Sequence, residues 1–222
     1  MIDKSQLTGA ILAGGQARRM QSLAQQSAHG QKQNEAIDKG LVHLAGRPLV
    51  AWQQELLQPA VNELIINANQ NLGRYAAYGR VVPDDDDLPA GQGPLIGLLS
   101  VLRHSRTPWV VVVPVDSPFL PADFIDRLWQ AQRQHPACRL FYCRAERDYP
   151  LCLLAHVEAA PGLADYIQAQ ERRVMPWLRQ YEAVAVEFGP QAAAAFTNIN
   201  TPRDLKDAAH LLAGQHGGQG SS

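Results

Sequence analysis

The amino-acid sequence predicts an α/β protein of one domain, and three features of the chain lead to this prediction. Short apolar runs alternate with helical patterns over most of its length, as in repeated β–α–β units. The run Trp109–Val115 is apolar on both alternating faces, which is typical of a central parallel strand covered on both sides. After Gln134 two closely spaced strand candidates indicate an antiparallel pair. We therefore expect a three-layer α/β/α fold with a mostly parallel, Rossmann-like central sheet and an antiparallel C-terminal portion.

The first part of the chain supplies four strand candidates with helices between them. Their apolar, β-branched composition predicts strands at Gly9–Leu12, Glu63–Asn67, Arg80–Val82 and Trp109–Val115. The intervening segments, some opened by a proline favoured in a first helical turn, predict helices at Pro48–Leu57, Leu72–Tyr78, Pro94–Arg103 and Ala122–Gln134. Because such sheets bind ligands beyond the carboxyl ends of their strands, polar residues at those ends are site candidates.

In the last third of the chain, the predicted strands and helices no longer alternate regularly. We expect its elements, in order, to be strands at Arg139–Cys143 and Pro150–Ala155, helices at Val157–Ala169 and Arg173–Gln180, a strand at Ala183–Phe188 and a helix at Pro202–Leu212. The domain is expected to span residues 1–213. Two polar segments lack these patterns, and we expect Gln21–Ile37 to be a flexible insertion and residues 214–222 to be a disordered tail.

Composition and charge exclude several classes of function. The chain has 20 basic and 21 acidic residues, so it lacks the positive field that would bind a nucleic acid or an anionic membrane. It contains no apolar run of about 18 residues and no signal-peptide pattern, which predicts a cytoplasmic protein. The three cysteines, Cys138, Cys143 and Cys152, lack the spacing of a zinc site and are expected to be free thiols.

A glycine turn follows the first predicted strand and is a candidate phosphate site. Leu12-Ala13-Gly14-Gly15 is followed closely by Arg18, Arg19 and Met20. Paired glycines let backbone N–H groups approach a phosphate, and arginines neutralise it. On these residues alone, an ordinary turn with solvated arginines fits equally well. The spacings of a P-loop and of a dinucleotide-binding Rossmann turn are both absent from this segment, so the sequence does not favour an ATPase or a dehydrogenase.

Other candidates lie at the ends of later strands. Asp116 ends the run that begins at Trp109, where a carboxylate suits Mg²⁺ bridging substrate phosphates; its alternative role is to cap the next helix. Asn67 ends another strand and can donate and accept hydrogen bonds, although a simple asparagine turn explains it too. Near the C-terminus, Asn198 and Asn200 are two residues apart and so lie on the same side of an extended segment.

Taken together, these strings resemble one family. Over about residues 8–210, the chain is similar to molybdenum cofactor guanylyltransferases in the ordered strings Leu12-Ala13-Gly14-Gly15, Asp38-Lys39-Gly40, Asn67-Ala68-Asn69, Gly93-Pro94-Leu95-Ile96-Gly97, Asp116-Ser117-Pro118, Glu171-Arg172-Arg173-Val174 and Asn198-Ile199-Asn200-Thr201-Pro202. The resemblance implies transfer of GMP from GTP to the terminal phosphate of molybdenum-molybdopterin, with release of pyrophosphate and with Mg2+ as cofactor. It also implies molybdenum insertion proteins and molybdoenzyme chaperones as protein partners.

The resemblance assigns roles residue by residue. It implies catalytic roles for Asp116, which holds the metal, and for Lys39 and Arg19, which offset the phosphate charge. Residues implied in GTP binding are Leu12, Ala13, Gly14, Lys39, Asn67, Asp84 and Asp116. Those implied in acceptor binding are Arg172, Arg173, Asn198 and Asn200. A shift by one residue would put Asp85 in the place of Asp84.

The chain departs from the family after Met20. Gln21-Ser22 replaces a pair of glycines, and seventeen residues separate Met20 from Asp38. Because the cost of loop closure grows only logarithmically with length, Lys39 can still return to the site. Three alternatives stay open: transfer of CMP to molybdopterin, transfer of a nucleotide to a sugar phosphate, and a non-catalytic adaptor that binds nucleotide or cofactor. The string Leu12-Ala13-Gly14-Gly15, with glycine in place of alanine at position 14, favours guanine by resemblance.

Overall fold

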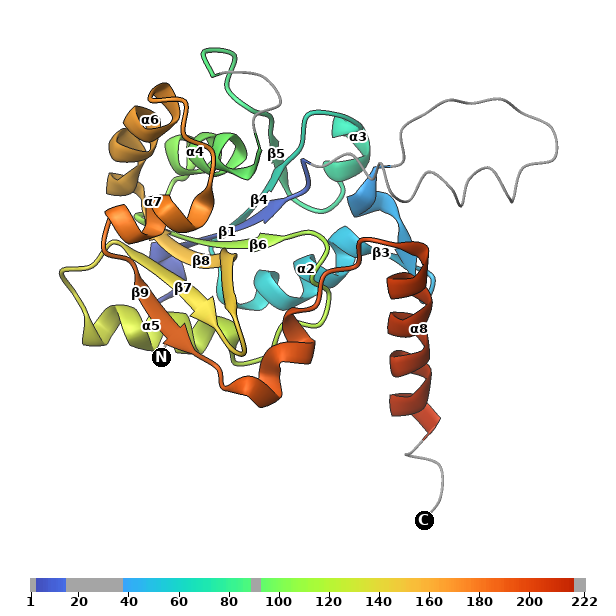
Figure 1. Ribbon diagram of the computed structural model, residues 1–222. Helices are drawn as coiled ribbons and strands as arrows, with labels where there is room; N and C mark the ends of the chain where they lie inside the picture. The colour runs from blue at the N-terminus through green and yellow to red at the C-terminus, as the bar shows by residue number, and fades with distance from the viewer. Residues whose placement is uncertain (1–2, 15–37, 89–92, 218–222) are drawn as a thin grey trace.

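The computed structural model describes residues 3–14, 38–88 and 93–217, which form a central sheet with helices on both faces (Figure 1). The sheet has seven strands in the order β5-β4-β1-β6-β8-β7-β9. Strand β8 runs antiparallel to both of its neighbours, and the other neighbouring pairs in this sheet are parallel. The predicted fold class is therefore confirmed, including the antiparallel pair late in the chain.

Most predicted elements are present with ends within three residues of the prediction. The strands of the sheet are β1 (Leu7–Leu12), β4 (Glu63–Asn67), β5 (Arg80–Val82), β6 (Trp109–Pro114), β7 (Leu140–Arg144), β8 (Asp148–His156) and β9 (Val184–Glu187). The α-helices are α2 (Leu49–Leu57), α3 (Leu72–Tyr75), α4 (Pro94–His104), α5 (Phe124–Gln134), α6 (Ala160–Gln168), α7 (Val174–Gln180) and α8 (Pro202–Gly217). Short 3-10 helices are η1 (Lys4–Gln6), η2 (Lys39–Leu41), η3 (Gln58–Ala60), η4 (Val157–Ala159) and η5 (Pro190–Phe196).

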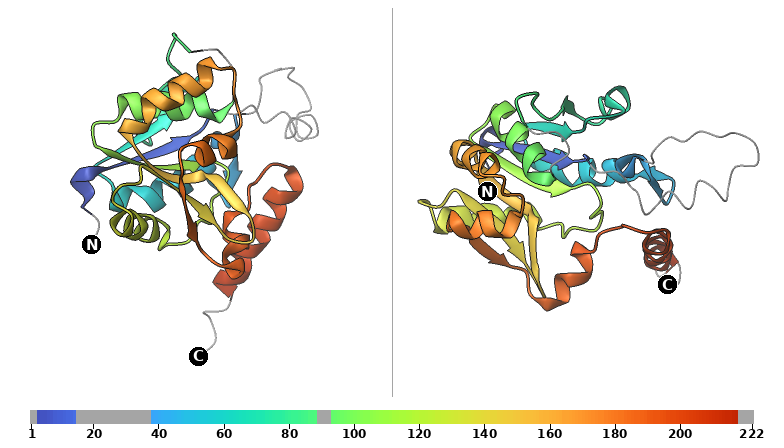
Figure 2. Two further views of the ribbon diagram at one scale, coloured as in Figure 1. Left: turned by 60° about the vertical axis from the view of Figure 1, so that its left-hand side comes forward. Right: turned by 45° about the horizontal axis from the view of Figure 1, so that its top comes forward.

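The two faces of the sheet build two separate hydrophobic cores. Side chains alternate along each strand, so in β1 Leu7 and Ile11 pack on one face while Ala10 and Leu12 pack on the other. Helices α2 and α5 cover the first face, and α4, α6 and α7 cover the second (Figure 2). Strand β6 is buried from Trp109 to Val113, which explains why its sequence is apolar at consecutive positions.

Two features differ from the sequence prediction. A hairpin of β2 (His43–Leu44) and β3 (Arg47–Pro48) was not predicted, because strands of two residues give no periodic pattern; its turn uses positive φ values of 49° at Ala45 and 80° at Gly46. Helix α8 continues to Gly217, so residues 214–217, expected to belong to a disordered tail, are helical. No proline follows Pro202 in this segment to end the helix.

Two of the predicted segments include residues outside the described ranges. Gln21–Ile37 lies outside the described residues, as does the segment 218–222. Among the helices that are described, none is long and apolar enough to cross a membrane.

Candidate active site

Three parallel strands end side by side and bring the sequence motifs to one place. Leu12 at the end of β1 pairs with Asn67 at the end of β4 and, on its other side, with the end of β6. The pairing continues beyond the strands, because the N–H of Ala13 donates to the Asn67 carbonyl at 2.9 Å and that of Val115 donates to the Leu12 carbonyl at 3.1 Å. Ala13 and Gly14, Asn67 and Asp116 therefore stand at or just beyond neighbouring strand ends, at the edge where such folds bind ligands.

Lys39 reaches this edge from helix η2. Its ammonium group forms an ion pair with Oδ2 of Asp116 and donates to Oδ1 of Asn200 at 2.5 Å. The side chains of Lys39 and Asp116 are each 13% exposed, so water screens their attraction only in part. The second oxygen of Asp116, Oδ1, is buried and has no hydrogen-bond partner among the described residues. A buried carboxylate oxygen of this kind is suited to a cation or to a donor from a ligand.

The residues at Asp116 fit a magnesium ion that takes a single carboxylate from the protein. No group of three or more histidine, cysteine, aspartate or glutamate side chains that could hold a metal occurs in the described part of the chain. Mg²⁺ does not require such a group, because it usually takes one or two protein carboxylates and completes its shell with phosphate oxygens and water. The free Oδ1 of Asp116 matches this mode, so a metal here would be shared with a phosphorylated substrate.

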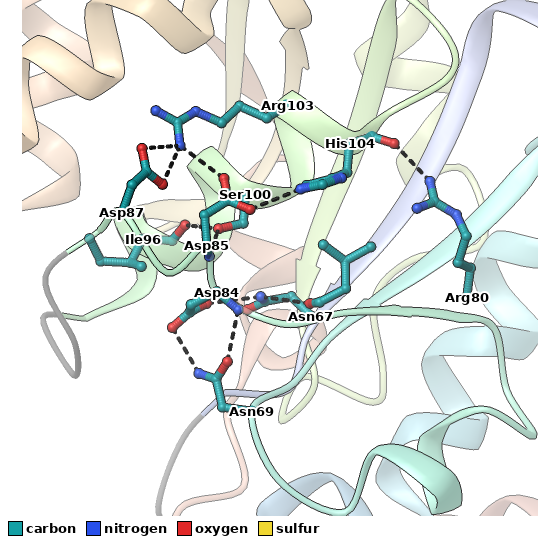
Figure 3. A network of polar contacts seen from close by, with 11 residues as sticks. Asn67, Asn69, Arg80, Asp84, Asp85, Asp87, Ile96, Ser100, Arg103 and His104 are labelled. Carbon is teal, nitrogen blue, oxygen red and sulfur yellow. Dashed lines mark hydrogen bonds and ion pairs between the residues drawn. The ribbon is translucent and has the colours of Figure 1, made fainter.

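Asn67, Asn69 and Asp84 form a compact polar cluster (Figure 3), and Gly14 lies next to it. Asn67 is 3% exposed, and its amide nitrogen donates to the Val82 carbonyl at 3.1 Å and to Asp84 at 3.0 Å. Asn69 donates to the other Asp84 oxygen at 2.8 Å and accepts from the Asp84 N–H at 2.8 Å. Both amide hydrogens of Asn67 are therefore used within the protein, which leaves its oxygen as the group that can face a ligand. Asn69 was not among the predicted site residues.

The Gly-Pro-Leu-Ile-Gly string at the start of helix α4 has a glycine at position 97 because Asn67 packs against it. A Cβ atom added at Gly97 would lie 2.1 Å from Oδ1 of Asn67, so a side chain there would displace Asn67. Gly93, immediately before the helix, has a φ of 93°, a conformation that favours glycine. The two glycines of the Gly-Pro-Leu-Ile-Gly string thus let the helix start sharply and pack against the site.

Asp85 points away from this cluster toward helix α4. Its carboxylate accepts from Arg103 at 2.9 Å and lies 2.8 Å from Nε2 of His104, while its N–H donates to Ser100 at 2.9 Å (Figure 3). Burial alone would raise the pKa of Asp85, but the hydrogen bonds from Arg103 and His104 outweigh it and lower that pKa. These bonds fix the turn from which Asp84 reaches the site.

Asp38 fixes the short helix that carries Lys39. Its Oδ1 accepts from the N–H of Gly40 at 3.2 Å and from the Tyr75 hydroxyl, and its Oδ2 accepts from Asn71 at 3.0 Å. Tyr75 is fully buried, and burial together with the bond to Asp38 raises the pKa of its hydroxyl far above the ordinary range, so it stays a neutral donor. A Cβ atom at Gly40 would lie 2.4 Å from the Tyr75 oxygen, which explains the glycine after Lys39.

The C-terminal asparagines lie with these residues. The N–H of Ile199 donates to the Asp116 carbonyl at 2.8 Å, and the Ser117 hydroxyl donates to Oδ1 of Asn198 at 2.9 Å. Asn200, as noted, accepts from Lys39. Asn198 and Asn200 are thus bonded to Ser117 and to Lys39, the chain neighbour and the ion-pair partner of Asp116, and their role in acceptor binding stays a prediction.

The arginines predicted for the acceptor lie just before the start of helix α7. Arg172 and Arg173 are exposed and precede helix α7. In the part of the chain that the structure describes, neither guanidinium group forms a hydrogen bond or an ion pair with Asn198 or Asn200, and Arg173 is held through its carbonyl by the Tyr166 hydroxyl at 3.1 Å. Arg19 lies outside the described residues. The structure thus joins the predicted nucleotide residues closely but not the whole predicted acceptor set.

A lysine and a carboxylate meeting beside a glycine turn at the edge of a mostly parallel sheet define a nucleotidyltransferase-like enzyme, and comparisons with known proteins agree. Residues 9–184 match the family model of the MobA-like NTP transferase domain. Proteins described as molybdenum cofactor guanylyltransferase from Yersinia pestis and Yersinia pseudotuberculosis are 37% identical over 199 residues, which cover 89% of this chain and 92% of theirs. The chain therefore belongs to the MobA-like nucleotidyltransferase family, and these guanylyltransferases resemble it over most of its length.

Solved structures confirm the fold. The molybdopterin-guanine dinucleotide biosynthesis protein A from Archaeoglobus fulgidus superposes with a TM-score of 0.71 at 21% identity, covering 93% of this chain and 99% of that one. A CMP:2-keto-3-deoxy-manno-octonic acid synthetase complexed with CTP gives a TM-score of 0.66 at 15% identity, covering 95% of this chain and 100% of that one. At these identities the likeness concerns the arrangement of the sheet and helices.

Proposed function

We propose that this enzyme transfers GMP from GTP to the terminal phosphate of molybdenum-molybdopterin, giving the molybdopterin guanine dinucleotide cofactor and pyrophosphate. The observation that carries the proposal is the meeting of Lys39 and Asp116 beside the glycine turn, with one buried Asp116 oxygen unpaired. Membership of the nucleotidyltransferase family and the 37% identity to guanylyltransferases support it.

The nucleotide would lie along the ends of β1 and β4. We assign GTP binding to the backbone of Leu12, Ala13 and Gly14, to Asn67 and Asp84, and to Lys39 and Asp116. Asp84 is preferred to Asp85 because Asp85 is engaged with Arg103 and His104 on helix α4. A carbonyl or carboxylate oxygen in this cluster can accept from the N–H and amino groups of guanine or from the ribose hydroxyls.

Charge neutralisation would come from three groups. We propose that Asp116 would hold Mg2+, and that the ion, when bound, would offset negative charge on the substrate phosphates. Lys39, which pairs with Asp116 in the structure, is placed to contact the triphosphate as well. Arg19 completes the proposed set, since it follows the glycine turn closely in the sequence.

The reaction needs little proton chemistry from the protein. A terminal phosphate has its second pKa near 6 and is largely ionised at pH 7, so no strong general base is required. An acceptor oxygen attacks the α-phosphorus of GTP, the bond from that phosphorus to the bridging oxygen breaks, and pyrophosphate leaves with the electron pair. Catalysis would then depend on positioning and on charge neutralisation by Lys39 and Asp116 with its ion.

The acceptor and the cellular context are proposed on sequence resemblance. Arg172 and Arg173 carry the positive charge that an anionic pterin phosphate needs, and Asn198 and Asn200 would face it at the junction with the nucleotide. A cytoplasmic location fits the free thiols of the described chain, Cys138, Cys143 and Cys152. Molybdenum insertion proteins and molybdoenzyme chaperones are the protein partners that this location and product would require.

Pyrophosphate release from each NTP, measured with and without molybdopterin in the presence of Mg²⁺, tests the proposal. We expect release with GTP that depends on molybdopterin. Preference for CTP would replace guanine by cytosine in the assignment, and release with a sugar phosphate as acceptor would replace the pterin. GTP binding without any pyrophosphate release would favour the non-catalytic adaptor and contradict the proposed reaction.

A further inference from the structure

Tyr75 belongs to none of the sequence motifs, yet it contacts the motif that carries the catalytic lysine. It lies on helix α3, 37 residues after Asp38, and its hydroxyl donates to the Asp38 carboxylate. Tyr75 has no exposed surface, so the ring is held by packing in the same core as Leu41 and Leu44. A buried tyrosine with its hydroxyl directed at a carboxylate is a rigid donor, because ring and hydroxyl are both fixed.

Asn71 contacts the same carboxylate. It is the N-cap residue before helix α3, has a φ of 52° and makes no side-chain cap hydrogen bond to that helix. Its amide instead donates to Oδ2 of Asp38 at 3.0 Å. Tyr75 at the end of α3 and Asn71 at its N-cap therefore bind the two oxygens of Asp38.

Helix η2 depends on this support. It consists of three residues, Lys39–Leu41, and Asp38 is its N-cap through the bond to the N–H of Gly40. A single 3-10 turn has few internal hydrogen bonds, so its orientation is set by contacts from outside the turn. Lys39 is the first residue after the cap, and a rotation of Asp38 would move the whole lysine side chain relative to Asp116.

We propose that Tyr75 is a positioning residue for Lys39 and acts through Asp38, with Asn71 as the second support of the same carboxylate. The hydroxyl of Tyr75 sets the rotation of the Asp38 carboxylate, the carboxylate sets the turn, and the turn aims the lysine at the triphosphate. This inference rests on the proposed nucleotidyl transfer, because it concerns the lysine of that reaction.

The test is a double-mutant cycle between Tyr75→Phe and Lys39→Met. For each variant, two quantities are measured: the rate of pyrophosphate release at saturating molybdopterin, and the affinity for Mg²⁺–GTP by calorimetry. In the presence of Lys39, removal of the Tyr75 hydroxyl is expected to lower kcat/KM for GTP about tenfold, as typical for loss of a hydrogen bond to a charged group. The KM for molybdopterin should stay within twofold. In the Lys39→Met background, Tyr75→Phe should change neither activity nor Mg²⁺–GTP affinity further.

Tyr181→Phe is the matched control. Its hydroxyl donates to the Gly162 carbonyl at 2.9 Å, so the variant also removes one hydrogen bond, but outside the site. We expect wild-type kinetics from it. Thermal unfolding of each variant shows whether it is folded, and if Tyr75→Phe does not fold, Asn71→Ala replaces it in the cycle with a smaller loss in the same direction.

Additive losses in the cycle would overturn the positioning role, as would full activity of Tyr75→Phe. Different results would contradict the proposed function and leave the role of Tyr75 testable. If the wild-type enzyme used CTP in place of GTP, the guanine assignment would fall, and the same cycle run with CTP would still decide the role of Tyr75. If the wild-type enzyme released no pyrophosphate at all, the same double-mutant cycle, measured by Mg²⁺–GTP affinity, would decide the role of Tyr75.

Discussion

The proposed nucleotide half and the proposed acceptor half of the site are built differently. In the nucleotide half, Asn67, Asp84 and Asp116 stand at the ends of neighbouring strands or beside them, and their polar atoms are mostly buried and bonded. In the acceptor half, Arg172 and Arg173 precede helix α7 and are exposed to water. The side chains of the nucleotide half are thus held by contacts within the protein, whereas those of the two arginines are exposed. Changes in the first half should alter catalysis or stability, and changes in the second should alter acceptor affinity.

The largest effect is expected from Asp116→Ala. The substitution removes the carboxylate proposed to hold Mg²⁺, and loss of one such electrostatic group typically lowers kcat by about 10²- to 10³-fold. The fold should persist, because Lys39 keeps its hydrogen bond to Asn200. Pyrophosphate release and far-ultraviolet circular dichroism check both parts. Retained GMP transfer would break the assignment of the nucleotide half, and so would an unfolded variant.

A methyl group added at Gly97 tests the packing of the same half. In Gly97→Ala the new Cβ would lie 2.1 Å from Oδ1 of Asn67, so Asn67 must move. We expect about tenfold weaker GTP binding and a free energy of unfolding lower by about 1–3 kcal/mol, the usual cost of overpacking. Gly73→Ala is the control, since among the described residues no atom beyond its chain neighbours and its own helix backbone lies within 4 Å of its added Cβ, and it should leave GTP binding unchanged. Equal behaviour of the two variants would contradict the role of Gly97.

Substitution of Arg172 and Arg173 by glutamine tests the proposed acceptor half of the site. In Arg172→Gln with Arg173→Gln, we expect the KM for molybdopterin to rise about tenfold, because charge-assisted bonds to a phosphate are lost. The affinity for GTP should not change. Arg133→Gln, an exposed arginine on helix α5, serves as control. A loss of GTP affinity in the double variant would place these arginines in the nucleotide half instead.

The smallest effect concerns the turn that presents Asp84. Arg103→Gln removes a cation that lowers the pKa of Asp85, and we expect a loss of less than about 1 kcal/mol in the free energy of unfolding at neutral pH. Because the pKa of Asp85 is lower in the folded state, its stabilisation is complete above the ordinary value of 3.8 and disappears as the pH falls through the folded value. Urea unfolding of both proteins should therefore converge at the lowest pH. A difference that grows in acid would contradict this account.

The sequence predicted the parts of the molecule that depend on local pattern. Consecutive valines before Asp116 predicted a central strand with a carboxylate at its end, and this strand is present as β6. Asp38 and Tyr75 could not be paired in this way, because their contact spans 37 residues and no motif connects them. The hairpin of β2 and β3 was missed because its strands are too short for any periodicity to show.

Sequence patterns also could not distinguish the roles of adjacent residues of the same type. Asp84 and Asp85 stand in a run of four aspartates, and only tertiary contacts separate them: Asn67 and Asn69 bind the first, and helix α4 binds the second. The two-residue spacing of Asn198 and Asn200 predicted that both line one site, and this stays a prediction. It gave no indication that their hydrogen bonds would come from Ser117 and Lys39.

The central claim is that Lys39, Asp116 and the glycine turn meet at the triphosphate of GTP with a divalent ion. Calorimetric titration of the wild-type enzyme and of Asp116→Ala with GTP, each with and without Mg²⁺, tests it most directly. We predict that Mg²⁺ strengthens GTP binding to the wild-type enzyme and that this gain disappears in Asp116→Ala. Binding that is indifferent to Mg²⁺ in both proteins, or no uptake of guanine nucleotide at all, would contradict the claim.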